Sequence, residues 1–402
     1  MAINKKGIFE TLAHKISNID SNTSTSVIVD TLKAVKKADH NTIVSYDSDE
    51  ALPTASATNY RLAYVINTGN LRFNNGLQWD KLQTQLPQLK PEAPAFGGTV
   101  AGYRGGGQQP AASTVIDKYS FVSDGNASDV GDLAQARYGN QGVQSNLAGY
   151  MMGGRTPNAQ PSNVIHKITF ASDTVAYAGF TMSVGRQQMA TNGVSTETHA
   201  YATTGGGGSE PIGKTIDKFA FANEATMTDV GDLFMVASDT PSVHTDVNGR
   251  YGYIAGGAND WPSPSITTTA HTLIQKFSTT SDGNAVDAVT QLDFQRYRTG
   301  SNTSPTHGYV TGGTKITPPT VPTSNEIVKY SFTSTDVATD VGDLTTARVR
   351  TGGTSSIASG YSHGGQPGAS NVIQKFPFAT DANATDVGDL TTNTGASAGA
   401  HQ

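Results

Sequence analysis

A short pattern of alternating apolar and polar residues recurs along residues 97–402 and predicts many of the strands there. In each copy an isoleucine is followed by a variable residue, a lysine and a further apolar residue, as in "IDKYSF" at 116–121. Alternation with a period of two is typical of β-strands that bury one face. The lysines of the six copies recur at intervals of about 50 residues and are Lys118, Lys167, Lys218, Lys276, Lys329 and Lys375.

Each copy belongs to a longer repeat. A tyrosine followed by a glycine pair lies upstream, as in "GYRGG" from Gly102, and a weaker segment of small residues precedes it. The sequence "DVGDL" follows four of the copies, at 129–133, 229–233, 340–344 and 386–390. We therefore expect four short strands in each repeat. A four-stranded sheet needs cover on both faces, so six such repeats predict a mainly β protein with a six-bladed β-propeller at 97–402.

The glycine pair after a tyrosine-containing strand, the period and the four-strand unit resemble the kelch family. Kelch repeats usually carry a tryptophan in the outer strand, whereas this chain has only Trp79 and Trp261. We expect the leucine of "DVGDL", or Leu292 in the fourth repeat, to take that packing role. The ring also needs its ends joined. We expect the last twelve residues to supply the inner strand of the first blade; a frayed tail is the alternative.

The first 96 residues follow a different pattern. Residues 1–40 have two narrow apolar stripes at helical spacing, which predict two short helices that anchor or oligomerise the chain. Residues 41–84 predict a small β-module that resembles one found in phage tail and fibre proteins. The resemblance is carried by Leu52, Pro53, Gly69, Phe73, Asn75, Gly76 and Trp79. Residues 85–96 are rich in proline and predict a semi-rigid linker.

Composition narrows the classes of function. The absence of cysteine excludes disulfides, cysteine zinc sites and thiol catalysis. A net charge of −6 provides no basic field, so we expect no nucleic-acid partner. The first residues are too polar for a signal peptide, and no apolar run is long enough to span a membrane. We expect the chain to be made in a host cytoplasm.

The motifs with possible chemistry favour structural roles. The two aspartates of "DVGDL" are three apart and face opposite ways in a strand, which favours a glycine bulge over a calcium site. "SDGNASD" at 123–129 is more typical of a turn than of a calcium loop. The histidines are scattered, and no metalloprotease, nucleophile-elbow or P-loop motif occurs. We expect no metal, no cofactor and no enzymatic activity.

The candidate ligand-binding residues are four arginines and a tryptophan. Arg137, Arg186, Arg296 and Arg348 follow the predicted outer strands. The kelch resemblance implies that such arginines line a binding mouth for acidic ligands; inter-blade ion pairs or bonds to carbonyl oxygens are the alternative. The loops between second and third strands differ most among the repeats. The longest of them carries Trp261, a candidate contact for a carbohydrate or a protein.

The resemblance to the phage module, together with the absence of catalytic motifs, implies a phage virion protein, a tail fibre or surface appendage that acts in host attachment. Residues 1–84 would bind other virion proteins, and the propeller loops would bind a host glycan or outer-membrane protein. We expect a homo-oligomer, with a trimer favoured. A neck or capsid decoration protein is the first alternative. A glycan-processing enzyme is the second, and it would need two converging carboxylates.

Overall fold

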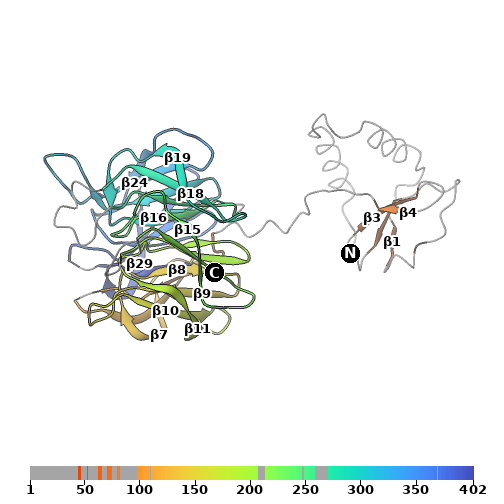
Figure 1. The fold of residues 1–402 in the computed structure, drawn as a ribbon, viewed down its shortest axis with the longest axis horizontal. Helices are drawn as coiled ribbons and strands as arrows, with labels where there is room; N and C mark the ends of the chain where they lie inside the picture. The colour runs from red at the N-terminus through yellow and green to blue at the C-terminus, as the bar shows by residue number, and fades with distance from the viewer. Residues whose placement is uncertain are drawn as a thin grey trace. The chain divides into compact units, whose positions relative to one another are not determined.

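The chain is mainly β in a computed structural model, and it divides into two compact units, Met1–Lys90 and Pro91–Gln402 (Figure 1). The structure describes residues 44–46, 52, 62–65, 70–74, 79–81, 97–108, 110–206, 213–246, 249–258, 270–368 and 370–402. The predicted helices of 1–40, the predicted linker 85–96 and Trp261 lie outside these ranges. Within them, no helix is long and apolar enough to cross a membrane.

The described part of the first unit is one four-stranded sheet in the order β1-β2-β3-β4. Its strands are β1 (Val44–Tyr46), β2 (Leu62–Val65), β3 (Asn70–Asn74) and β4 (Trp79–Lys81). β1 runs parallel to β2, and the other pairs are antiparallel. All four strands lie within residues 41–84, for which the sequence predicts a small β-module.

The second unit is a six-bladed β-propeller, as the repeats predict. The first blade contains β30 (Ala398–His401), β5 (Ala101–Gly105), β6 (Ser113–Ser120) and β7 (Ser128–Arg137). The second contains β8 (Gln141–Gln144), β9 (Ala148–Met152), β10 (Ser162–Thr169) and β11 (Thr174–Arg186). The third contains β12 (Val194–Ser195), β13 (His199–Ala202), β14 (Thr215–Ala220) and β15 (Thr228–Asp232).

The remaining blades repeat this antiparallel order. The fourth contains β16 (Ser242–Thr245), β17 (Tyr251–Ala255), β18 (Leu273–Ser278) and β19 (Val286–Gln291). The fifth contains β21 (Gly300–Thr303), β22 (His307–Thr311), β24 (Glu326–Ser331) and β25 (Thr339–Asp343). The sixth contains β26 (Gly352–Ser355), β27 (Ser359–His363), β28 (Ser370–Pro377) and β29 (Thr385–Thr394). A short ladder joins β20 (Arg296–Tyr297) to β23 (Thr314–Lys315).

The C-terminal strand closes the ring, which confirms the predicted closure. β30 pairs antiparallel with β5, from Ala398 opposite Gly105 to His401 opposite Gly102. The C-terminus accordingly lies beside β8 and β9 of the second blade (Figure 1). The first blade therefore combines one strand from the end of the chain with three from the start of the propeller.

The hydrophobic core lies between the faces of neighbouring blades. One cluster joins Ile116 and Leu133 of the first blade to Met151, Ile168 and Phe170 of the second. The leucines of the "DVGDL" copies and Leu292 are all buried, in agreement with the packing role expected for them.

"DVGDL" forms a bulged strand, as favoured over a calcium site. The Asp129 carboxylate accepts a hydrogen bond from the amide of Gly131, and the pairing with β6 shifts register at this point. The equivalent Gly388 has φ of 153°, and a Cβ there would lie 2.3 Å from the carbonyl carbon of Gly125 in the first blade. Glycine is needed because the turn of the next blade lies directly on it.

Candidate functional site

The repeated lysines form ion pairs between blades. Five of the six lysines reach an acidic residue in the turn between the third and fourth strands of the next blade. The pairs are Lys118–Asp173, Lys167–Glu224, Lys218–Asp282, Lys329–Asp381 and Lys375–Asp124. Tyr103 and Tyr361 also donate their hydroxyl groups to the acids of their junctions. The carboxylate of "SDGNASD" is therefore bound by a lysine and a tyrosine.

The variable residue before each lysine is a second connector. It is buried in every blade, and in five of them it accepts a hydrogen bond from a backbone amide in or just after the outer strand of the preceding blade. These five residues are Asp117, His166, Asp217, Gln275 and Gln374. Val328 takes the place in the fifth blade. Aspartate, histidine and glutamine are interchangeable here because each presents an acceptor to the amide.

Three of the four candidate arginines are fully buried at junctions between blades. Arg137 donates to the carbonyl oxygens of Gly153 and Val164, and burial lowers its pKa to about 10. Arg186 pairs with Asp217 at 3.0 Å. Arg296 pairs with Asp293 at 3.0 Å and also with Glu326.

The structure does not bring these arginines together at one point, since they belong to three separate junctions. Their contacts are those of the alternative interpretation, in which such arginines bind carbonyl oxygens and acids between blades. Arg348 is only half-buried, and its Nε donates to Thr346 Oγ1 at 3.0 Å. Ligand binding by these four residues stays a prediction.

Two residues after this arginine position, the chain passes the mouth of the propeller axis. Here backbone bonds run from blade to blade around the axis: Gly139 to Ala396, Ala396 to Arg350, Arg350 to Arg298, Arg298 to Asp239, Thr240 to Gln188 and Met189 to Gly139, written donor first. The circle is closed. It fixes the backbone of every blade at this mouth, so side chains on it are held by a rigid frame.

Arg298, Asp239 and Arg350 converge on this frame. Arg298 Nε lies 2.8 Å from Asp239 Oδ2, and Arg350 Nη2 lies 3.2 Å from Asp239 Oδ1. Asp239 is fully buried, while the side chains of Arg298 and Arg350 are 26% and 13% exposed. Two guanidinium groups around one carboxylate leave a net positive charge and further N–H donors toward solvent. We name Asp239, Arg298 and Arg350 the axial arginine site.

The variable loops surround the same mouth. In each blade, the loop between second and third strands forms a short β-bridge with the segment that enters from the preceding blade. Arg155 of one such loop pairs with Tyr138, and Gly206 of the next pairs with Gln187. The loops and the axial arginine site therefore share one face. The tip of the longest loop, with Trp261, lies outside the described residues, so its predicted contact stays a prediction.

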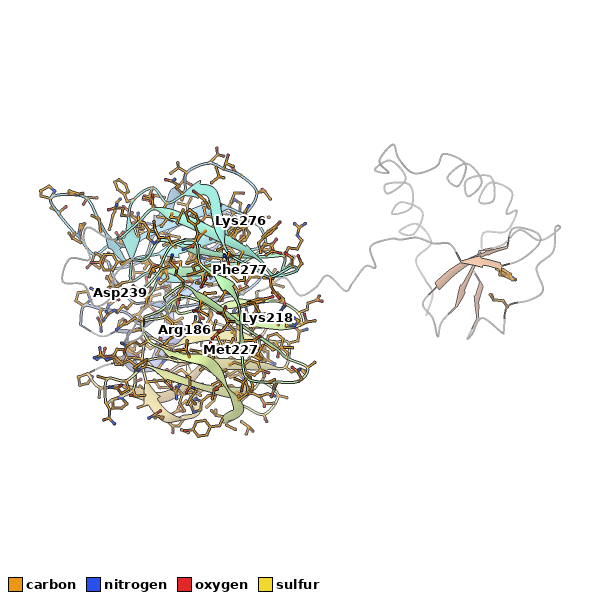
Figure 2. The ribbon with its side chains drawn as sticks, viewed as in Figure 1. Arg186, Lys218, Met227, Asp239, Lys276 and Phe277 are labelled. Carbon is orange, nitrogen blue, oxygen red and sulfur yellow. The ribbon has the colours of Figure 1, made fainter. Side chains whose placement is uncertain are left out.

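The opposite face carries a small cavity. Its volume is about 220 Å³, and its lining includes Gly98, Gln144, Asn146, Thr196 and His401. Nε2 of Gln144 and Nε2 of His401 are 3.1 Å apart. Figure 2 shows Lys218 on one side of the propeller and Asp239 toward the other. We name the side with Lys218 and the turns between third and fourth strands the turn face; the axial arginine site lies toward the other side.

The histidines that the structure describes do not gather into a ligand set. Burial lowers the pKa of His166 and of His244 to about 4, and that of His363 to about 3, so all three are neutral at pH 7. Among the residues that the structure describes, no group of three or more histidine, aspartate and glutamate side chains is placed to hold a metal ion.

Arg298 and Arg350 were not identified from the sequence as candidate site residues. The signal that could have found them is the repeated arginine in "RYR" at 296–298 and "RVR" at 348–350. The first arginine of each follows the repeat, while the second has no counterpart in the blades where Gly139 and Ala396 occupy the circle. Comparison with protein-family models gives no match for this chain, and comparison with curated proteins gives none either.

Proposed function

We propose that the chain is a non-enzymatic phage virion protein, a tail fibre or surface appendage with a kelch-like propeller. The face with the axial arginine site and the variable loops binds a host glycan or outer-membrane protein. The N-terminal unit binds other virion proteins, within a homo-oligomer for which we favour a trimer.

One observation carries the proposal of a binding face. Five of the six repeated lysines, and five of the residues before them, make contacts between blades, so the repeat maintains the ring. The loops between second and third strands contain neither of these repeated residues, and they differ from blade to blade. Binding residues concentrate on such loops when a rigid scaffold positions them. The axial arginine site adds charged donors that suit a carboxylate or phosphate group on a ligand.

The virion assignment is supported by the N-terminal unit. Leu52, Phe73 and Trp79 belong to the short sequence that resembles a phage tail and fibre module. Phe73 and Trp79 lie in β3 and β4 of the described sheet. A small β unit within residues 1–90 and a large propeller within residues 91–402 suit a division of labour between attachment to the particle and contact with the host.

Antibody fragments against the propeller test the proposal. Fragments raised against the purified full-length chain, and selected for binding to the loop face, should label particles at a surface appendage and slow their adsorption to host cells. The variant Arg298→Gln with Arg350→Gln should adsorb more slowly in reconstituted particles. Arg250→Gln, on the opposite face, is the matched control.

Other outcomes identify the alternatives. Label at the neck or capsid with unchanged adsorption would replace our proposal with a decoration role. Turnover of a glycan in a panel by the purified chain would replace it with an enzymatic one.

A further inference from the structure

The periodic ion pairs between blades are broken at one junction. Lys118, Lys167, Lys218, Lys329 and Lys375 each bind an acid of the next blade. Lys276 of the fourth blade has no ion pair with the fifth blade among the described residues. Its ammonium group instead lies 5.4 Å from the centre of the Tyr251 ring. A half-buried cation is therefore left where five equivalent cations have a carboxylate.

The cause is a changed turn in the fifth blade. Residues 334–338 read "STDVA", where the first blade has "SDGNA" at 123–127 and the fourth has the same sequence at 281–285. Thr335 takes the place of the acid. The next residue, Asp336, is acidic, but its carboxylate accepts from Ser334 Oγ and its carbonyl oxygen from Thr290 Oγ1.

Three exposed apolar or aromatic residues belong to the elements around this junction. Val286 lies opposite Lys276 in the pairing of β18 with β19 and is 54% exposed. Val337 follows the changed position in the turn and is 58% exposed, and Tyr251 is 37% exposed. We name Lys276, Tyr251, Val286 and Val337 the Lys276 patch. An exposed aromatic ring with aliphatic neighbours and a cation is typical of a surface that contacts another protein.

We propose that the Lys276 patch binds a polypeptide that presents an aspartate or glutamate side chain between apolar residues. At the other five junctions the equivalent lysine binds the carboxylate of a protein side chain, so the same group fits beside Lys276. A partner's carboxylate takes the place left by Thr335, and its apolar neighbours cover Val286 and Val337. The proposal is independent of the proposed function, because the patch and the axial arginine site lie on different faces. Lys276 and Lys218 lie on the side of the propeller away from Asp239 (Figure 2).

Short peptides test the chemistry of the patch. The probes are acetylated, amidated pentapeptides of sequence AVEVA and AVQVA, titrated into the full-length chain and followed by the methyl NMR signals of Val286. We expect the glutamate peptide to bind about tenfold more tightly than the glutamine peptide, because a hydrogen bond to a charged group in a partly buried place is worth about that factor. Lys276→Gln should remove the difference.

A transplanted turn provides the sharper test. Thr335→Asp, Asp336→Gly and Val337→Asn together give the fifth blade the turn sequence of the first. The new carboxylate should pair with Lys276 and weaken glutamate-peptide binding about tenfold, to the level of the glutamine peptide. The matched control keeps the last two changes but carries Thr335→Asn, so it lacks only the charge and should keep the preference for glutamate.

The outcomes are decisive because thermal unfolding of each variant shows whether it is folded. Equal affinity for the two peptides, or a preference for glutamate that survives the transplanted carboxylate, overturns the proposal. Methyl β-D-glucuronide is a further probe. If the sugar shifts the Val286 signals in the unaltered chain but not in Lys276→Gln, while the glutamate peptide shifts them in neither, the patch binds an acidic sugar. The polypeptide assignment is then wrong.

Discussion

Charged side chains at the blade junctions differ sharply in how much water surrounds them. Arg186 and Asp217 are both fully buried, and Asp217 also accepts from the hydroxyl of Ser183. One residue later, Lys218 and its acid are both partly exposed. Removing one partner of a buried pair strands a charge in a poorly solvated place, whereas an exposed pair loses little. Neighbouring residues in one strand should therefore differ greatly in their contribution to stability.

We expect Asp217→Ala to lower the free energy of unfolding by about 3–5 kcal/mol, because it leaves Arg186 buried without its carboxylate. Lys218→Ala should lower it by less than about 1 kcal/mol. Urea unfolding followed by far-UV circular dichroism measures the free energy of unfolding of both variants. Similar losses for the two variants would contradict the difference in burial on which this prediction depends.

His166 makes stability depend on pH. Burial lowers its pKa to about 4, whereas the unfolded chain takes up the proton near pH 6.5. The unfolded state therefore binds more protons between these values, and the free energy of unfolding falls as pH drops from 6.5 toward 4. Above pH 6.5 the histidine is neutral in both states and this loss is absent.

The variant His166→Gln tests this contribution without breaking the connection. Glutamine already accepts the equivalent bond at Gln275 and Gln374. We expect the loss of unfolding free energy between pH 7 and pH 4.5 to be about 2 kcal/mol smaller in the variant than in the unaltered chain. Denaturant curves at the two pH values measure it, and an unchanged pH dependence would assign the acid sensitivity to other groups.

At the scale of the element, the strand that closes the ring is short but well connected. β30 pairs with β5 along its whole length, and the carbonyl oxygen of Gln402 also accepts from the amides of Thr99 and Val100. The small side chains of Ala398 and Ala400 are fully buried. Without β30, the edge of β5 would expose its backbone groups on the inner side of the first blade.

Deletion of residues 398–402 should therefore lower the free energy of unfolding by on the order of 5 kcal/mol, since several backbone bonds of about 1 kcal/mol each and buried alanines are lost. Thermal unfolding and size-exclusion chromatography measure stability and association. Gln402→Ala, which keeps the backbone bonds, is the control. A truncated chain that stays monomeric with unchanged stability would show that the closure is dispensable.

The strands and their order were predictable because the same four-strand sequence pattern occurs in six repeats. The ring closure was predictable because the last residues resemble the start of an inner strand. Burial of the arginines was not, since "RYG", "RQQ" and "RYR" look alike whether the guanidinium turns inward or outward. The convergence of Asp239 with Arg298 and Arg350 was also beyond reach. It depends on backbone bonds among blades that are more than 50 residues apart in the chain.

At the scale of the molecule, each blade of the propeller is bound to both neighbours, and the circle of backbone bonds has no free end. A destabilising substitution in one blade should then lower the stability of the whole ring. We expect Asp217→Ala in the third blade and Gly388→Ala in the sixth to shift one common propeller transition, and their effects to add in the double variant because the sites share no partner. Differential scanning calorimetry measures this. Separate transitions for separate blades would contradict a ring that unfolds as a unit.

The ring closure also means that the first blade is completed late in synthesis of the chain. β5 leaves the ribosome about 300 residues before β30, which corresponds to roughly 15–60 s at about 5–20 residues per second. During that interval the first blade has three of its four strands, and one edge is open to other chains. The strand waiting there, "AGYRG", is only five residues long and carries Arg104. A short edge strand with a charge is a poor template for association, so the sequence of β5 suits a strand whose partner is made about 300 residues later.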